Sequence, residues 1–293
     1  MPSLRGMAFT TSHDAGSASQ RFVCLLYHDV YPTEGSDYGR LGRSAVMYHV
    51  SEAAFRQHLL LIGGTGERPM DMDAVRRSVA ARPSPTAGGR SGTVVCFDDG
   101  WAGAVTRGAA VLRELAMPAL FFVTTRFVGR KYFAARGDLR QLEPDLFTIG
   151  SHGASHRMLS SLPTAAIRED LSESKSWLED LLGRSVTALS IPGGAVDRRV
   201  VAVARELGYT EIFTSAIAVN PTTSGPWGIA RIGVTQTTTT ETVARWLALQ
   251  VERERWRKAM LALPKTMLGM RNYSRLRRTF LGDGDGYEPL FQP

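Results

Sequence analysis

Seven short apolar runs of β-branched and aromatic residues recur along the chain, and each stops abruptly at polar or small residues. They are Phe22–Tyr27, Thr93–Phe97, Ala119–Val123, Leu146–Ile149, Val186–Ile191, Glu211–Phe213 and Ile229–Val234. Short, continuous runs of this composition are typical of strands buried on both faces of a sheet. A chain with this pattern is expected to build a parallel sheet covered by helices.

Helical patterns separate these runs. Ser51 is a favourable N-cap for a helix that reaches Leu61, and Gly183 stands where a helix over 163–182 would place a C-cap glycine. The other expected helices span 102–115 and 197–207. Strands alternating with helices predict an α/β fold, and seven strands in about 215 residues favour a distorted (β/α) barrel of parallel strands. In such a barrel the residues that follow the strands meet at one end, where active sites lie.

The positive charge of the chain is concentrated near its C-terminus. The 293 residues carry a net charge of +7, yet the stretch from Arg245 to Leu281 holds ten Lys or Arg against two Glu, which leaves the rest of the chain at −1. We expect four parts along the chain. They are a disordered N-terminus over 1–20, the barrel over 21–240, a basic amphipathic helical appendix over 241–281 and a disordered tail over 282–293.

Two interpretations of the basic segment stay open. Its helices can pack on the barrel with their Arg stems over apolar surface, or residues 245–281 can contact an anionic membrane surface. No nucleic-acid-binding motif is present, so nucleic acid is not an expected partner. No apolar stretch resembles a signal peptide or a membrane span, and we expect a cytoplasmic protein with peripheral contact at the inner membrane face.

Four polar side chains follow the ends of two expected strands. Asp98 and Asp99 come directly after one strand, and His152 and His156 follow another. The spacing of the histidines brings two imidazoles to one side of a turn or helix, and a carboxylate from a neighbouring strand completes three ligands with open positions. That is the catalytic kind of metal site, and the second carboxylate stays free to take a proton from water that the metal makes acidic.

Three sequence blocks carry a resemblance to a known family. CFDDGW (96–101), GSHGASH (150–156) and SIPGG (190–194) follow one another as in the NodB-homology polysaccharide deacetylases, carbohydrate esterase family 4. The chain resembles this family over roughly residues 20–235, and its Asp-Asp-Gly and His-x₃-His blocks together are the specific part. The opening LLYHDV (25–30) resembles a subgroup that acts on exopolysaccharides of the poly-N-acetylglucosamine type.

The resemblance implies a function and individual roles. It implies a barrel of about seven strands with one divalent metal ion, usually zinc, held by Asp99, His152 and His156. Asp98 would be the general base, and the substrate would be an N-acetylated glycan or glycoconjugate that is hydrolysed to acetate and a free amine. Two alternatives stay open: an amidohydrolase of another amide, such as a formamido sugar or a small cyclic amide, and a carbohydrate-binding homologue with impaired catalysis.

The sequence departs from the family pattern at two positions. Ser190 stands where many members have an arginine that orients the base, and Arg231 could supply this guanidinium from a later strand or could face solvent. No histidine follows His156, so the late histidine that is the general acid in members with the full pattern is absent. His28, after the first strand, is the candidate acid, and a histidine that only hydrogen-bonds the strand end is the alternative.

Two tryptophans and one turn are expected to contact the substrate. Trp101 and Trp227 offer aromatic faces on which a sugar ring can stack, with packing in the core as the alternative. Pro192 and Gly193 of the SIPGG block are expected on the substrate side of the site.

The cysteines and two further histidines have no comparable context. Cys24 and Cys96 lie within apolar runs, so we expect two buried free thiols and no disulfide framework. His49 and His58 are expected at the surface.

Overall fold

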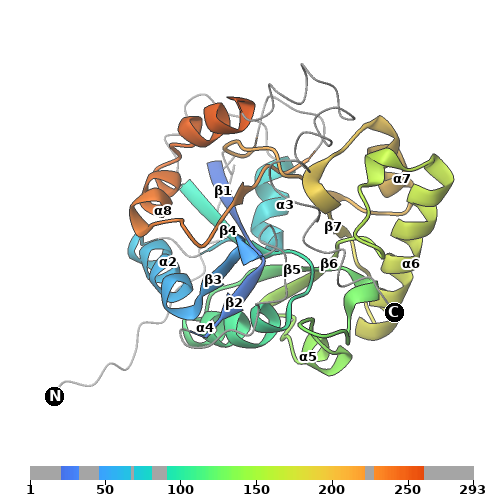
Figure 1. The fold of residues 1–293 in the computed structure, drawn as a ribbon, viewed down its shortest axis with the longest axis horizontal. Coiled ribbons are helices and arrows are strands. Elements are labelled where there is room, and N and C mark those ends of the chain that lie inside the picture. Colours follow the sequence, from blue (N-terminus) through green and yellow to red (C-terminus); the bar gives the residue numbers. More distant parts are fainter. Residues whose placement is uncertain (1–20, 33–45, 67–68, 81–90, 222–227, 261–293) are drawn as a thin grey trace, which may run out of the picture.

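Seven parallel strands form the main sheet of this computed structural model, which describes residues 21–32, 46–66, 69–80, 91–221 and 228–260. Their order across the sheet is β8-β7-β6-β5-β4-β1-β9, and helices surround them (Figure 1). The strands are β1 (Arg21–Tyr27), β4 (Ser91–Phe97), β5 (Ala119–Val123), β6 (Phe147–Ser151), β7 (Ala188–Ser190), β8 (Glu211–Phe213) and β9 (Ile232–Gly233). Each of the seven predicted runs overlaps one of these strands.

One short segment joins the two ends of this strand order. Ile229 forms a parallel bridge with Phe213 of β8, and shortly after it Ile232 of β9 pairs with Leu25 of β1. The sheet therefore curls back on itself. The prediction of a distorted (β/α) barrel is confirmed.

Alternate residues of the strands fill the interior of the barrel. The buried cluster consists of Phe22, Cys24, Leu26, Met70, Met72, Val75, Val94, Cys96, Leu120, Phe122, Ala188, Phe213 and Ile229. Two of its members, Met72 and Val75, come from α3 (Met72–Ala80), a helix that the sequence analysis did not predict. Cys24 and Cys96 are buried free thiols, as predicted.

The outer side of the sheet packs against helices through a second, larger apolar cluster. The α-helices there are α2 (Glu52–Gly64), α4 (Ala109–Glu114), α5 (Arg136–Arg140), α6 (Thr164–Leu182), α7 (Arg198–Glu206) and α8 (Thr240–Leu247). The shorter turns are a π-helical segment, η1 (Ala104–Gly108), and three 3₁₀ turns, η2 (Thr125–Phe127), η3 (Leu159–Ser161) and η4 (Pro192–Gly194). The predicted end signals hold, because Ser51 Oγ accepts the Ala54 N–H and Gly183 ends α6 at a φ of 65°.

A small second sheet lies beside the barrel. Its two parallel strands are β2 (Asp29–Tyr31) and β3 (His49–Ser51). The pairing buries His49, and His58 on α2 is buried against Tyr27, whose hydroxyl lies 3.2 Å from its Nδ1. The prediction that these two histidines lie at the surface is wrong. His49 lies in a short strand outside the predicted apolar runs, whereas the spacing of His58 from Phe55 and Ile62 on α2 was a usable signal of burial.

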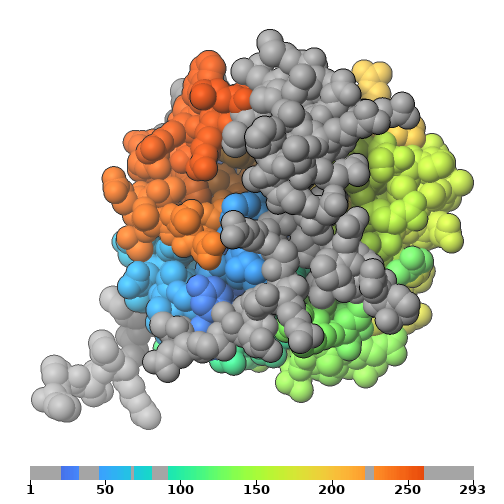
Figure 2. Space-filling model, viewed as in Figure 1, coloured from blue at the N-terminus to red at the C-terminus, as the bar shows by residue number. Residues whose placement is uncertain are grey.

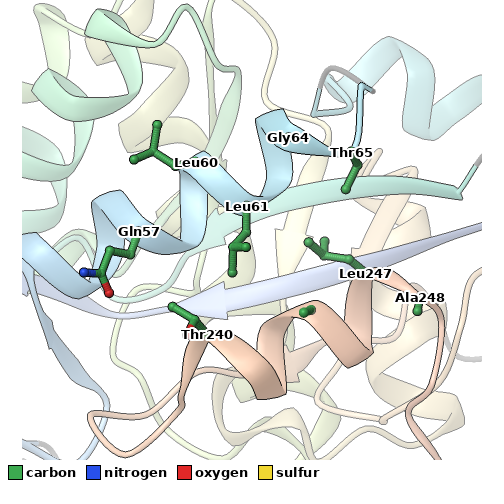
Figure 3. Close-up of a pocket in the computed structure, with 9 residues that line it drawn as sticks. Gln57, Leu60, Leu61, Gly64, Thr65, Thr240, Leu247 and Ala248 are labelled. Atoms are coloured by element: carbon green, nitrogen blue, oxygen red, sulfur yellow. The ribbon is translucent and has the colours of Figure 1, made fainter.

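The C-terminal helices divide into a packed part and an exposed part. Val243, Trp246 and Leu247 of α8 are buried in the same core as the barrel strands, so the expected boundary at residue 240 falls inside packed structure. Figure 3 shows α8 along α2, with a shallow apolar groove between them that is lined by Leu61 and Leu247. A further helix over 252–260 is exposed along most of its length.

Several expectations lie outside the described residues. These are disorder over 1–20 and 282–293, and the basic segment beyond residue 260. Within the described ranges, the helices are too short or too polar to span a lipid bilayer.

Candidate metal centre

The alternation that fills the barrel also brings the polar residues together. Side chains of a strand point to the same face every second residue, and Leu26, Cys96 and Ile229 face the interior. The next inward positions along these three segments are occupied by His28, Asp98 and Arg231. The carboxyl ends of parallel strands lie at one end of a barrel, so these residues converge there.

Three predicted ligands form a compact group. Oδ1 of Asp99 lies 3.3 Å from Nε2 of His152 and 3.1 Å from Nε2 of His156. All three candidate ligand atoms lie within 4.8 Å of one another. One carboxylate oxygen and two imidazole nitrogens are the donor set that a divalent ion such as zinc prefers in an open, catalytic site, so these residues fit the predicted ion.

Hydrogen bonds orient two of the ligands. The Trp101 indole N–H donates to Oδ2 of Asp99 at 3.0 Å, which leaves Oδ1 turned toward the histidines. Nδ1 of His152 lies 2.9 Å from the carbonyl oxygen of Ser190. A proton on Nδ1 satisfies that carbonyl and leaves the Nε2 lone pair free for a cation, which is how outer hydrogen bonds fix ligating histidines.

The loop between the two histidines is anchored by a buried aspartate of α6. Asp170 accepts the backbone N–H groups of Ala154 and Ser155 at 2.8 and 3.1 Å. Gly153, at a φ of 72°, passes so close that a Cβ there would lie 2.6 Å from Oδ1 of Asp170. Asp170 was not predicted as a site residue from the sequence. A charged residue within the apolar face of a regular helix does indicate a buried, paired carboxylate.

Arg231 holds the neighbouring carboxylate. Its Nη1 and Nη2 donate to the two oxygens of Asp98 at 2.7 and 2.9 Å, and its side chain has no exposed surface. The Arg231 Nε donates to the carbonyl oxygen of Thr214 at 3.0 Å. Of the two alternatives for Arg231, the structure has the inward one, and its role in a reaction stays a prediction. The bidentate pair fixes the plane of the Asp98 carboxylate.

Both carboxylates are ionised at neutral pH. Burial alone would raise the pKa of Asp98, but the charge of Arg231, followed by that of His152, lowers it. Burial opposes ionisation of Asp99 as well, and His156 and His152 hold its pKa well below the usual value. Burial lowers the pKa of His152, yet the charge of Asp98 and the hydrogen bond to Asp99 outweigh this and raise it. Asp98 is thus available as a proton acceptor.

His28 lies at the same end of the barrel as these groups. Its ring centroid is 4.8 Å from that of Tyr48, and among the described residues its buried Nδ1 has no hydrogen-bond partner. Burial lowers the pKa of His28, and the charges of Asp99 and Asp98 oppose this only in part. His28 is therefore a neutral imidazole at pH 7 in the protein alone.

The residues predicted to contact substrate differ in how exposed they are. Trp101 is fully buried and its ring lies 4.5 Å from both Phe133 and His49, so a sugar cannot stack on it. Its indole orients Asp99 instead. Pro192 is buried and Gly193 is exposed at a φ of 64°, and their contact with substrate stays a prediction. Trp227 lies outside the described residues.

Comparison with known proteins finds a family similar to the segment that contains this site. Residues 87–212 match the family model described as polysaccharide deacetylase. The protein YxkH of Bacillus subtilis, named as a candidate polysaccharide deacetylase, is 21% identical over 141 residues, which are 48% of this chain and only 50% of that relative.

Solved structures share the fold at low sequence identity. The deacetylase PplD of Streptococcus pyogenes is 16% identical with a TM-score of 0.67, and IcaB of Ammonifex degensii is 24% identical with a TM-score of 0.65. Each comparison covers 78% of this chain and 98% of the other. The matched residues 87–212 include the candidate cation ligands Asp99, His152 and His156, and this segment is similar to the polysaccharide deacetylase family.

Proposed function

We propose that the protein is a metal-dependent hydrolase that removes the N-acetyl group from an N-acetylamino sugar of a polysaccharide, oligosaccharide or lipid-linked glycan. One observation carries the proposal beyond family membership. Asp98, an ionised carboxylate held by Arg231, lies with its Oδ2 3.7 Å from Nε2 of the candidate ligand His152. A proton acceptor beside an open three-ligand site is the arrangement that amide hydrolysis by water requires.

Each residue has a distinct role in this proposal. Asp99, His152 and His156 hold one divalent cation, with zinc as the first choice for this donor set. The cation supplies Lewis-acid chemistry, which polarises a carbonyl oxygen and makes water more acidic. Asp98 accepts the proton of the attacking water, and Arg231 keeps it ionised and oriented.

His28 is proposed as the donor to the leaving amine. A neutral imidazole is too weak an acid for this step, so His28 has to take a proton from solvent before it donates one to the leaving amine, and Asp98 returns the proton of the attacking water to solvent. Negative charge that develops on the amide oxygen raises the pKa of a nearby imidazole and provides the driving force. A product amine and acetate then account for all atoms of the amide and water.

A homologue that only binds carbohydrate is the second alternative, and it would bind the glycan without releasing acetate. An amidohydrolase of another amide uses the same groups, and a substrate panel separates it from the deacetylase.

The test is acetate release across N-acetylated glycans and lipid-linked sugars, with and without chelator. The purified protein is expected to contain about one divalent ion per chain. Asp98→Asn is expected to keep the ion and lose acetate release, because an amide cannot accept the proton. Asp180→Asn, an exposed position of α6, is the matched control. Full activity of Asp98→Asn would remove Asp98 from the reaction, and wild-type protein that releases only formate would favour the other amide.

We also propose that the exposed helix over 252–260 contacts an anionic lipid surface. Trp256 and Met260, one turn apart, are 71% and 65% exposed. Arg253, Arg255 and Arg257 lie on the same short helix, and Figure 2 shows this segment, in red, at the surface beyond α8. Exposed apolar side chains flanked by basic residues fit the headgroup region of an anionic membrane.

A further inference from the structure

A serine at the end of β7 contacts both halves of the site. Ser190 is fully buried. Its Oγ donates to Oδ2 of Asp98 at 3.1 Å and accepts from Nη2 of Arg231 at 2.8 Å. Its carbonyl oxygen lies 2.9 Å from Nδ1 of His152. One residue thus joins the proton acceptor, its guanidinium partner and a cation ligand.

We infer that Ser190 is a positioning residue that fixes the proton-accepting oxygen of Asp98 relative to the cation ligands. The inference rests on the function proposed above. Oδ2, the oxygen that Ser190 contacts, is also the oxygen that faces Nε2 of His152. Oδ1 is turned toward Nη1 of Arg231 at 2.7 Å. Ser190 therefore acts on the oxygen that meets the water proton.

The hydroxyl closes a ring of three hydrogen bonds that Arg231 alone cannot make. Nη2 of Arg231 reaches both Oδ2 of Asp98 and Oγ of Ser190, and Oγ in turn reaches Oδ2. The guanidinium fixes the carboxylate within one plane, and the hydroxyl adds a contact from a different strand. Because the site is buried, the loss of the hydroxyl leaves a donor of Arg231 with one acceptor fewer.

Ser190 contacts His152 through its backbone carbonyl oxygen and Asp98 through its hydroxyl, so the two contacts can be tested separately. Replacing the Ser190 side chain leaves its carbonyl oxygen in place, so the orientation of His152 is preserved. Ser190→Ala is therefore expected to change the position of Asp98 without changing the affinity for the cation.

The first measurement is the kinetics of Ser190→Ala. We expect kcat to fall about 10- to 100-fold, the usual effect of losing an outer hydrogen bond at such a site. KM and the affinity for Zn²⁺ in a competition with a chromophoric chelator are expected to stay within about twofold of wild type. Ser190→Thr keeps the hydroxyl and is expected to recover part of kcat. Ser78→Ala, at a buried serine of α3, is the control for removing a buried hydroxyl.

The second measurement needs no substrate. The d–d absorption of bound Co²⁺ reports the groups around its open positions, and Ser190→Ala is expected to change it at unchanged Co²⁺ affinity. Unchanged kcat and an unchanged spectrum would overturn the inference. So would a loss of kcat that follows a matching loss of bound metal or of melting temperature. A wild-type protein without acetate release would remove the proposed function, while the Co²⁺ spectrum would still decide the inference.

Discussion

Asp98 is held by an arginine that lies 133 positions later in the chain. The sequence could place Asp98, Asp99 and the two histidines, because short motifs follow predicted strands. It left Arg231 undecided between the site and solvent, since no local pattern links residues so far apart. The hydroxyl of Ser190 has the same distant partners, so its part in the site became visible only once the strands were arranged in space.

Removing Arg231 is expected to affect both activity and stability. Arg231→Met leaves the buried Asp98 carboxylate without its counter-charge, which costs about 3–5 kcal/mol in the free energy of unfolding. Arg231→Lys keeps the charge but loses the bidentate contact, and we expect kcat/KM to fall about 10-fold or more. Urea unfolding and acetate release measure the two effects. Wild-type stability of Arg231→Met would show that the pair does not form in solution.

At the scale of elements, the strands of the main sheet and helices with clear end signals were predictable, whereas α3, β2 and β3 were not. The seven strands and the helices α2, α6 and α7 follow from apolar runs, periodicity and end signals. β2 and β3 were not predicted, because neither lies in a separate apolar run of the sequence, and they are stabilised by pairing with one another. Charge composition does not show that α8 packs on the barrel, so the packing of this helix became visible only in the structure.

Asp170 of α6 holds the loop between His152 and His156, and this role can be tested by measuring cation binding. Asp170→Asn replaces an acceptor oxygen by an NH₂ group that faces the backbone N–H donors of Ala154 or Ser155. We expect the affinity for Zn²⁺ to fall about 10- to 100-fold, because the loop no longer holds His156 in place. A competition with a chromophoric chelator measures this. Asp180→Asn lies on the same helix, and an equal loss there would contradict the prediction.

The burial of His49 in β3 gives the fold a pH dependence. Burial lowers the pKa of His49 to about 3 in the folded protein, whereas an unfolded chain titrates near 6.5. Below about pH 6.5 only the unfolded chain gains this proton, so the free energy of unfolding decreases by up to about 1.4 kcal/mol per pH unit from this residue. Urea unfolding at pH 7 and pH 5, with chelator present, measures how much the free energy of unfolding falls between these two pH values. We expect a smaller fall for His49→Gln than for the wild-type protein. An equal fall in the free energy of unfolding for both proteins would contradict the contribution of His49.

At the scale of the whole molecule, the excess charge is local. The barrel segment is close to neutral, and the basic excess lies in the C-terminal stretch of the chain. Within the described part of that stretch, α8 packs on α2 and the helix over 252–260 is exposed. The packed part ends near Val251 and an exposed helix follows it, and contact of this helix with a membrane stays a prediction.

Binding to lipid vesicles tests the exposed helix. The protein is expected to sediment with vesicles that contain anionic lipid and not with neutral ones, and to be released by salt, because each basic residue contributes about 1 kcal/mol near the surface. Trp256→Ala with Met260→Ala is expected to weaken this binding. Leu60→Ala with Val79→Ala removes two apolar side chains elsewhere that are 56% and 49% exposed, and serves as the control. An equal effect of both pairs would contradict a specific role of the helix.

The segment that closes the barrel has a consequence for protein synthesis. The three candidate cation ligands come from one continuous central stretch of the chain, whereas Arg231 reaches Asp98 from the segment that leads into the last strand, β9, which docks beside the first, β1. If the proposed roles hold, a chain that ends before β9 lacks the partner of Asp98 even where all three candidate ligands are present. Such a chain is therefore expected to lack activity altogether, and not to retain a fraction of it.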